Sequence, residues 1–326
     1  MIVSKTPLRI SFFSGGSDTP AFYKREDGAA LSVTIDKFIH VIVRKTPNLP
    51  IKTMFSVVDE SDNIEDMKHI ISRESLKLFN IDSEITIASL SDIFSNGSGL
   101  GSSSAFTVGL VNSLFKINNT DTSKETIAKC ACDIEMNRCG YPVGKQDQYA
   151  AAYGGFNLLK FYSDQNVSIE KIYSENIPKL NDNLLLVYSG IGRVGNDFLQ
   201  KQSDAMLNDE KFNRVKQNRD LAFEGIKYIL SGDLDSFGDL LHQSWINKRQ
   251  IVNDITEDYL DNIYNIAKES GAIGGKLLGA GGGGFFVFYV KEDKREEVIH
   301  TLKNKTNCKI FPFKFYDEGT KIMSYE

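Results

Sequence analysis

The chain has 326 residues, 41% hydrophobic and 25% charged, which is enough for two globular domains with a core each. Its net charge of -5 provides no overall positive field to attract nucleic acid or an anionic membrane surface. No apolar run approaches the roughly 20 residues of a membrane-spanning helix, and the first ten residues lack the apolar segment of a signal peptide. We therefore expect a cytoplasmic protein with neither nucleic acid nor membrane as a partner.

Strands and helices alternate irregularly along the chain. The predicted elements, in chain order, are a strand at 29–43, helices at 65–79, 103–115, 123–137, 212–230, 234–245 and 258–270, a strand at 285–290 and a helix at 295–302. This order is typical of two α+β units rather than of one doubly wound sheet. The polar stretch 162–182 is the best candidate for a boundary, so we predict domains at 1–172 and 173–326.

A glycine-rich loop runs directly into an apolar helix. Alternating glycines allow left-handed backbone and a close approach to a ligand, and the serines fall where the free N–H groups of a helix N-terminus favour an anion. The spacing fits neither a Walker A loop nor the dinucleotide fingerprint, and a merely capped helix is the alternative. The predicted phosphate-binding residues are Gly97, Ser98, Gly99, Leu100, Gly101, Ser102, Ser103 and Ser104.

Three segments in this order resemble the GHMP kinases, the family of galactokinase, homoserine kinase and mevalonate kinase. They are residues 6–18, the glycine-rich loop and residues 274–285. Within the family, residues 144–149 and Trp245 with Lys248 resemble the D-glycero-D-manno-heptose 7-phosphate kinases and similar sugar 1-kinases. The resemblance implies an N-terminal domain like ribosomal protein S5 domain 2, a ferredoxin-like C-terminal domain, and ATP and Mg²⁺ bound in the cleft between them.

The resemblance also assigns roles to individual residues. Asp147 would accept or orient the proton of the acceptor hydroxyl, and Arg9 would stabilise charge beside it. Ser103 and Glu135 would hold Mg²⁺, which prefers hard oxygen ligands. The sugar would contact Gly15, Gly16, Ser17, Asp18, Asp147, Gly281 and Gly282, and a phosphate already on the sugar would need distant cations, for which Arg193 and Lys248 are the candidates.

Several interpretations stay open at this point. The acceptor is a heptose 7-phosphate phosphorylated at O1, or fucose, galactose or a hexosamine. A ligand-binding regulator without turnover is a further alternative, although Asp147, Ser103 and Glu135 are all present. Trp245 suits either a sugar-binding face or a core. The cysteines at 130, 132 and 139 lack the paired spacing of a zinc site, so we expect free thiols.

Overall fold

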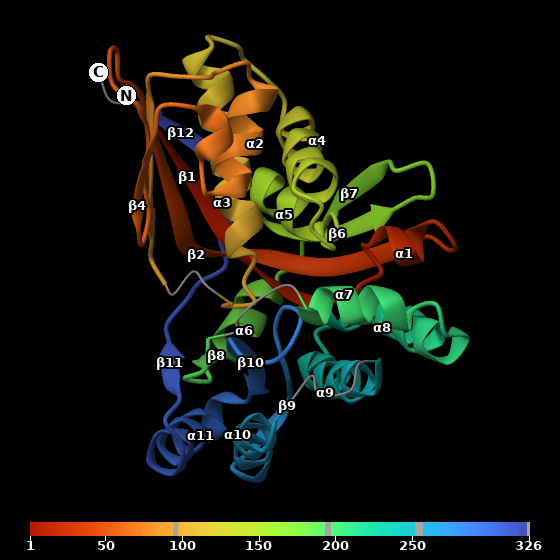
Figure 1. The fold of residues 1–326 in the computed structure, drawn as a ribbon. Helices are drawn as coiled ribbons and strands as arrows, with labels where there is room; N and C mark the ends of the chain where they lie inside the picture. The colour runs from red at the N-terminus through yellow and green to blue at the C-terminus, as the bar shows by residue number, and fades with distance from the viewer. Residues whose placement is uncertain (94–96, 193–196, 252–256, 325–326) are drawn as a thin grey trace.

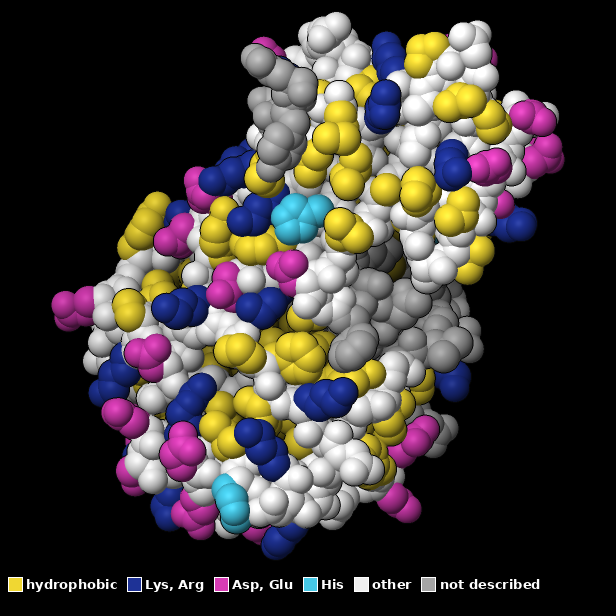
Figure 2. Space-filling view, turned by 90° about the vertical axis from the view of Figure 1, so that its left-hand side faces the viewer, with side chains coloured by type: hydrophobic (Ala, Val, Ile, Leu, Met, Phe, Trp, Pro, Cys, Tyr) yellow, Lys and Arg dark blue, Asp and Glu magenta, His cyan; other side chains and the backbone are white. Residues whose placement is uncertain are grey.

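The computed structural model describes residues 1–93, 97–192, 197–251 and 257–324, and it contains two β-sheets with helices packed on them (Figure 1). The expected two-domain α+β architecture is therefore confirmed. Among the described residues, no helix is long and apolar enough to cross a membrane. On the face drawn in Figure 2, basic and acidic side chains are interspersed, as expected from a chain without a strong net charge.

The first sheet is built around two long antiparallel strands. The central strand β2 pairs with β1 on one side, and on its other side it pairs first with β6 and then with β5. The order along the sheet is β12-β1-β2-β5-β3-β4, with β6 and β7 continuing from β2. The strands of this sheet in the described residues are β1 (Ile2–Phe13), β2 (Gly28–Lys45), β3 (Ile51–Met54), β4 (Val58–Ser61), β5 (Ile85–Ser91), β6 (Phe156–Phe161), β7 (Val167–Lys171) and β12 (Lys321–Ser324).

One face of this sheet is covered by helices, as Figure 1 shows. The most buried of them packs against both β1 and β2, which explains why its sequence is apolar almost all the way round. The helices of this part are α1 (Pro20–Tyr23), α2 (Ile70–Leu78), α3 (Ser102–Ile117), α4 (Lys124–Cys132) and α5 (Gln146–Tyr153), with a 3₁₀ turn at Ile64–Asp66.

The helix expected at 123–137 changes character partway along. It is α-helical as far as Cys132 and continues as a π-helix, Asp133–Arg138. The wider turn ends with the N–H of Cys139 donating to the carbonyl of Ile134, 2.8 Å away. Short π-helical turns occur frequently at functional sites, and this one contains Glu135.

The second sheet has the antiparallel order β11-β8-β10-β9. Every residue of its strand Phe285–Val290 is buried, because helices and the neighbouring strands enclose it. The elements of this part are α6 (Ile177–Asp182), β8 (Leu184–Tyr188), α7 (Asp197–Ala205), α8 (Asp209–Ser231), α9 (Leu234–Ile251), α10 (Asp258–Glu269), β9 (Ala272–Leu277), β10 (Phe285–Val290), α11 (Glu292–Lys305) and β11 (Lys309–Phe311). Helix α8 packs on α9 and also on β1 and β2, so it joins the two parts.

The chain returns to the first sheet after leaving the second. Strand β12 pairs with β1, and the hydroxyls of Thr6 and Thr320 lie 2.8 Å apart in a hydrogen bond. The first sheet therefore combines residues 2–171 with residues 321–324. The domain boundary expected at 172/173 stays a prediction.

Candidate active site

The glycine-rich loop leads directly into helix α3 and borders a pocket that residues from both parts of the chain line, the main pocket of the site. Gly97, Gly99 and Gly101 have φ values of 66°, 78° and 76°, which is left-handed backbone that favours glycine. Helix α3 begins at Ser102, so the free N–H groups of its first turn lie where Ser102 and its two following serines line the pocket. This end of the pocket is suited to the phosphates of a bound nucleotide.

The glycine-rich loop meets the second glycine-rich segment of the chain, residues 278–284 between β9 and β10, at close range. A Cβ atom on Gly99 would lie 2.5 Å from the carbonyl oxygen of Leu278, and one on Gly279 would lie 2.5 Å from the Cα of Gly99. The N–H of Phe285 also donates to the carbonyl of Ser98 over 3.0 Å. Two loops from the two parts of the chain therefore form one continuous wall of the pocket, and glycine is required on both sides of the contact.

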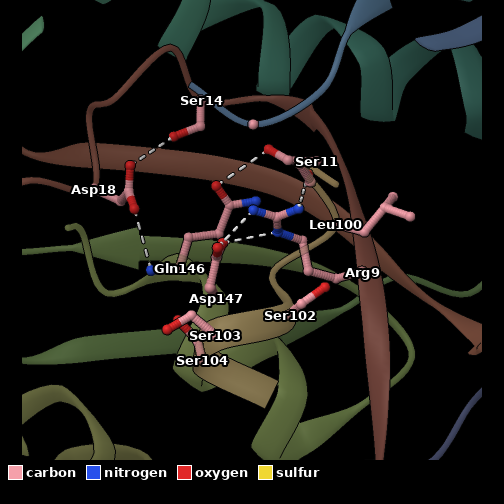
Figure 3. Close-up of polar contacts among 12 residues, drawn as sticks. Arg9, Ser11, Ser14, Asp18, Leu100, Ser102, Ser103, Ser104, Gln146 and Asp147 are labelled. Carbon is pink, nitrogen blue, oxygen red and sulfur yellow. Dashed lines mark hydrogen bonds and ion pairs between the residues drawn. The ribbon is translucent and has the colours of Figure 1, made fainter. Parts of the chain in front are cut away.

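Arg9 and Asp147 form a two-pronged ion pair beside this loop (Figure 3). Arg9 donates from Nε to Oδ1 over 2.8 Å and from Nη2 to Oδ2 over 2.6 Å. Its Nη1 donates to the carbonyl of Gly99 over 2.5 Å, so one guanidinium connects the carboxylate to the loop. Asp147 lies in the first turn of α5 and keeps 27% of its side chain exposed, against 7% for Arg9. The carboxylate is therefore fixed in direction and still reachable from the pocket.

Asp18 lies on an adjoining wall of the same pocket. It accepts a hydrogen bond from Ser14 Oγ over 3.1 Å and one from the backbone N–H of Gln146 over 3.2 Å (Figure 3). Burial raises the pKa of Asp18, and the neighbouring charge of Asp147 raises it further. Because Gln146 directly precedes Asp147, this hydrogen bond holds the carboxylate of Asp18, between β1 and α1, on the same side of the pocket as that of Asp147 on α5. Both carboxylates are able to accept hydrogen bonds from hydroxyl groups.

Glu135 is a buried carboxylate rather than a solvated surface acid. It is 1% exposed and accepts hydrogen bonds from Ser103 Oγ at 2.9 Å, Ser104 Oγ at 2.7 Å and Thr107 Oγ1 at 3.0 Å. Gln148 Nε2 donates to it as well. Burial raises the pKa of Glu135, and these hydrogen bonds oppose that shift. Its position behind the serines means that it orients the hydroxyls at the start of α3.

Two lysines from the C-terminal part of the chain border the pocket. Lys248 Nζ donates to the carbonyls of Leu277 and Gly279, at 2.9 and 2.5 Å. Lys276 Nζ donates to the carbonyl of Phe12 at 2.6 Å, so it connects β9 to β1. Lys276 is only 5% exposed, and burial lowers its pKa to about 7, with the charge of Arg9 acting in the same direction. Lys248 therefore connects α9 to the second glycine-rich segment, and Lys276 connects β9, the strand before that segment, to β1.

The structure gathers most of the predicted site residues around this single pocket. Those that line it are Arg9, Gly15, Gly16, Asp18, Gly97, Ser98, Gly99, Gly101, Ser102, Ser103, Ser104, Asp147 and Lys248. Others lie behind its surface or beside it. Ser17 is buried and donates to the carbonyl of Ala29, Leu100 is buried and accepts from the N–H of Arg9, and Gly282 packs against Phe198. The second glycine-rich segment lines the pocket through Gly279 and Ala280 rather than through the predicted Gly281 and Gly282.

Three further expectations have different outcomes. Arg193 lies outside the described residues. Trp245 is fully buried in the core between α9, α10 and the second sheet, where it packs edge-on against Phe286, so it is a core residue and not a sugar-binding face. The cysteines are free thiols, and no cluster of three metal-binding side chains occurs within residues 1–93, 97–192, 197–251 and 257–324.

Sequence reasoning missed several residues that line the pocket. They include Ser11, Ser14, Gln146, Gln202, Asn218 and Lys276. Lys276 lies in the resembling segment 274–285 and is the one charged residue among its glycines, which is an indication of a site residue that the sequence offers. Gln146 directly precedes Asp147, whereas Gln202 and Asn218 belong to helices far along the chain, which only the fold brings to the pocket.

Two family models match the chain. The GHMP kinases N terminal domain matches residues 64–155, and the GHMP kinases C terminal model matches residues 226–307. Together these matches cover more than half of the chain, and they include the glycine-rich loop, Glu135, Asp147 and Lys276.

Characterised relatives extend the match over the whole length. The chain is 29% identical to the D-glycero-alpha-D-manno-heptose 7-phosphate kinase of Campylobacter jejuni, over 98% of both chains. It is 28% identical to a galactokinase of Clostridium acetobutylicum, over 66% of this chain and 64% of the relative.

Solved structures agree with the architecture. A D-glycero-D-manno-heptose 1-phosphate kinase from Bacteroides thetaiotaomicron superposes with a TM-score of 0.81 at 22% identity, covering 100% of both chains. The galactokinase of Lactococcus lactis in complex with galactose gives a TM-score of 0.76 at 15% identity, covering 98% of this chain and 94% of that one. At these identities the structures support the fold alone.

Proposed function

Because the chain belongs to the GHMP kinase family, we propose that it transfers the terminal phosphoryl group of ATP to the anomeric hydroxyl of a heptose 7-phosphate. Its broader class is a sugar kinase, since heptose phosphate kinases and galactokinases are among its relatives. One observation carries the proposal. The carboxylate of Asp147 is held in the pocket by Arg9, and the same arginine contacts the phosphate-binding loop at Gly99.

Transfer of a phosphoryl group depends on holding the phosphates and aiming the acceptor oxygen at them. The loop from Gly97 to the start of α3 provides backbone N–H groups and serine hydroxyls for the phosphates. Arg9 contributes a positive charge between that loop and Asp147, where negative charge develops during transfer.

Asp147 is the group that receives the acceptor hydroxyl. Each of its oxygens accepts one hydrogen bond from Arg9 and keeps a lone pair for a further donor. The proton of the acceptor hydroxyl is held at, or moves to, one of these oxygens as the bond from the acceptor oxygen to the γ-phosphorus forms and the bond from that phosphorus to the bridging oxygen breaks, which releases ADP. An anomeric hydroxyl is more acidic than an ordinary alcohol, so a modest base is sufficient for this step.

The residues at the start of α3 fit Mg²⁺, which prefers few hard oxygen ligands in addition to phosphate oxygens. Ser103 is exposed at the pocket and gives its proton to Glu135, so the lone pairs of its oxygen are available to a cation. Ser103 would hold the ion, with Glu135 as a second ligand or as the group that orients Ser103. When bound, Mg²⁺ would neutralise charge on the phosphates of ATP.

The phosphate already on the sugar needs cations of its own in the pocket. The Campylobacter jejuni relative, matched over 98% of both chains, is named for the 7-phosphate, and the Bacteroides thetaiotaomicron structure is named for the 1-phosphate. Arg193 and Lys248 remain the proposed cations for the distal phosphate. Lys248 donates to the carbonyl of Gly279, and Gly279 packs against Gly99 of the phosphate-binding loop. Lys248 therefore lies nearer to the proposed site of the ATP phosphates than a cation that binds only the distal sugar phosphate would need to.

The proposal is tested by measuring turnover with ATP and Mg²⁺ over heptose 7-phosphate, free heptose, fucose, galactose and hexosamines. We expect kcat/KM to be highest for heptose 7-phosphate and the product to carry the new phosphate at O1. Equal or better turnover of an unphosphorylated sugar would contradict the heptose 7-phosphate assignment and favour a free-sugar 1-kinase. Binding of ATP and sugar with no turnover would favour a ligand-binding regulator.

A further inference from the structure

We infer that the side-chain amide of Asn218 recognises a hydroxyl group of the acceptor sugar that is not the reacting one. The inference rests on the proposed function, because it needs a polyhydroxylated acceptor. Asn218 lies on α8, far along the chain from both glycine-rich segments, and it borders the main pocket.

The position of Asn218 on its helix is that of a core residue. The buried face of α8 is otherwise apolar, and Asn218 is 0% exposed in the middle of it. Its neighbours one turn away on that face are Val215, Leu221 and Ala222, all buried. A polar residue in such a stripe is unfavourable unless its amide has partners, because burying an unsatisfied polar group costs stability.

Asn218 has no such partners in the part of the chain that the structure describes. There, neither its Oδ1 nor its Nδ2 makes a hydrogen bond, and both atoms are buried. The nearby amide of Gln202 is different, because its Nε2 donates to the carbonyl of Gly15 over 2.5 Å. Two amides therefore lie near the same turn, and the one without a hydrogen-bond partner among the described residues is the one whose polar atoms are available to a ligand.

The surroundings of Asn218 belong to the sugar side of the pocket. Asn218 packs so closely on Gly15 that a Cβ there would lie 2.6 Å from its own Cβ. Gly15 follows Ser14, which is hydrogen-bonded to Asp18, and Asp18 in turn accepts from the N–H of Gln146. This chain of contacts leads from Asn218 to the residue next to Asp147.

The chemistry of this wall matches hydroxyl groups. Gln146 is also incompletely satisfied, because its Oε1 accepts from Ser11 while its buried Nε2 has no hydrogen-bond partner among the described residues. The wall therefore offers a carboxylate acceptor at Asp18, an amide donor at Gln146, and one donor with one acceptor at Asn218. A hydroxyl both donates and accepts, so the amide of Asn218 is able to read one hydroxyl or an adjacent pair.

The test uses a shape-preserving substitution. Asn218→Leu keeps the branching of the side chain and removes both polar atoms, and Asn218→Ala is a smaller alternative if leucine does not fit. Ser113→Ala is the matched control, since Ser113 is another buried residue whose side-chain hydroxyl finds no partner within residues 1–93, 97–192, 197–251 and 257–324, and it lies on α3 outside the lining of the main pocket. For each variant we would measure the melting temperature without ligand, and kcat and KM for ATP and for the preferred sugar of the wild type.

We expect the leucine variant to melt at the same temperature as the wild type or higher, because an unsatisfied amide has been removed. Its KM for the sugar should rise about 10-fold to 100-fold, while its KM for ATP stays within about twofold. The wild type should discriminate strongly against one monodeoxy analogue, and the variant should lose that discrimination. Ser113→Ala should leave both KM values unchanged.

An unchanged KM for the sugar in both Asn218 variants would overturn the inference. A lower melting temperature with equal losses for sugar and ATP would overturn it as well, because it would assign Asn218 a structural role. Failure of the proposed function has a different outcome. In that case the wild type itself binds ATP and phosphorylates no sugar, and the sugar-hydroxyl assignment of Asn218 falls with it.

Discussion

Asp147→Asn is the substitution that most directly tests the centre of the site. The change keeps the shape of the side chain and removes its charge, and it replaces one acceptor oxygen by an amide group that faces a donor of Arg9. We expect kcat to fall on the order of 10²-fold or more, because the acceptor hydroxyl loses its proton acceptor. We also expect a loss of stability, which a purely catalytic role would not produce.

The size of the stability loss follows from the burial of the pair. Breaking a fully buried ion pair costs about 3–5 kcal/mol. An exposed pair contributes about 0–1 kcal/mol. Arg9 is 7% exposed and Asp147 is 27% exposed, so the pair lies between these limits. Arg9 keeps its hydrogen bond to Gly99, and we therefore expect Asp147→Asn to lower the free energy of unfolding by about 2 kcal/mol.

A double-mutant cycle with Arg9→Met, Asp147→Asn and the double variant separates the pair from its surroundings. Urea unfolding gives the stability of each protein, and steady-state kinetics gives kcat and both KM values. Asp121→Asn is the matched control, because Asp121 is fully exposed and pairs with Lys116 only at 3.7 Å. The control should lose less than about 0.5 kcal/mol and keep its activity.

Two results would refute this reasoning. Additive stability losses, with no coupling between the Arg9 and Asp147 substitutions, would mean that the ion pair does not hold the carboxylate. Near-normal kcat in a folded Asp147→Asn protein would remove Asp147 from the proposed mechanism.

Three further predictions concern the surroundings of this pair. Glu135→Gln should raise the Mg²⁺ concentration needed for half-maximal activity several-fold, since the buried carboxylate orients the serines of α3; an unchanged Mg²⁺ titration would contradict this. Burial lowers the pKa of Lys276 to about 7 in the folded protein, so between about pH 7 and pH 10 the unfolded chain binds more protons and the stability of the wild type rises with pH. Lys276→Met should remove this contribution, so the melting temperature of the wild type should rise with pH relative to that of the variant. Gly99→Ala should raise the KM for ATP at least 10-fold, because its Cβ would lie 2.5 Å from the carbonyl of Leu278; a normal KM would show that the loop adapts easily.

The sequence was sufficient for the features that depend on local chemistry. Alternating glycines followed by serines predicted a loop and helix start that the structure confirms, and the apolar run at 285–290 is the buried strand β10. The pairing of Arg9 with Asp147 was expected from family resemblance, and the two residues are in direct contact. Their roles in catalysis and binding stay predictions.

The remaining features depend on long-range packing. Glu135 lies in a helical segment whose pattern alone is typical of a solvated acid, and only the tertiary contact with α3 buries it. Asn218 could have been noticed as the polar residue on the apolar face of its helix, yet nothing local indicates that Gly15 packs against it. Lys276 was visible within its motif, but its contact with Phe12 joins residues 264 positions apart.

The return of strand β12 to β1 has a consequence for biosynthesis. The edge of the first sheet next to β1 is not covered until residues 321–324 have been made, after the whole of the second sheet. During translation the nascent N-terminal part therefore exposes the unpaired backbone of β1, which is a site for association with other chains or chaperones. Ribosomes that stop before residue 321 would release a product with a nearly complete pocket and an open sheet edge, and we expect that product to aggregate rather than to act as a smaller enzyme.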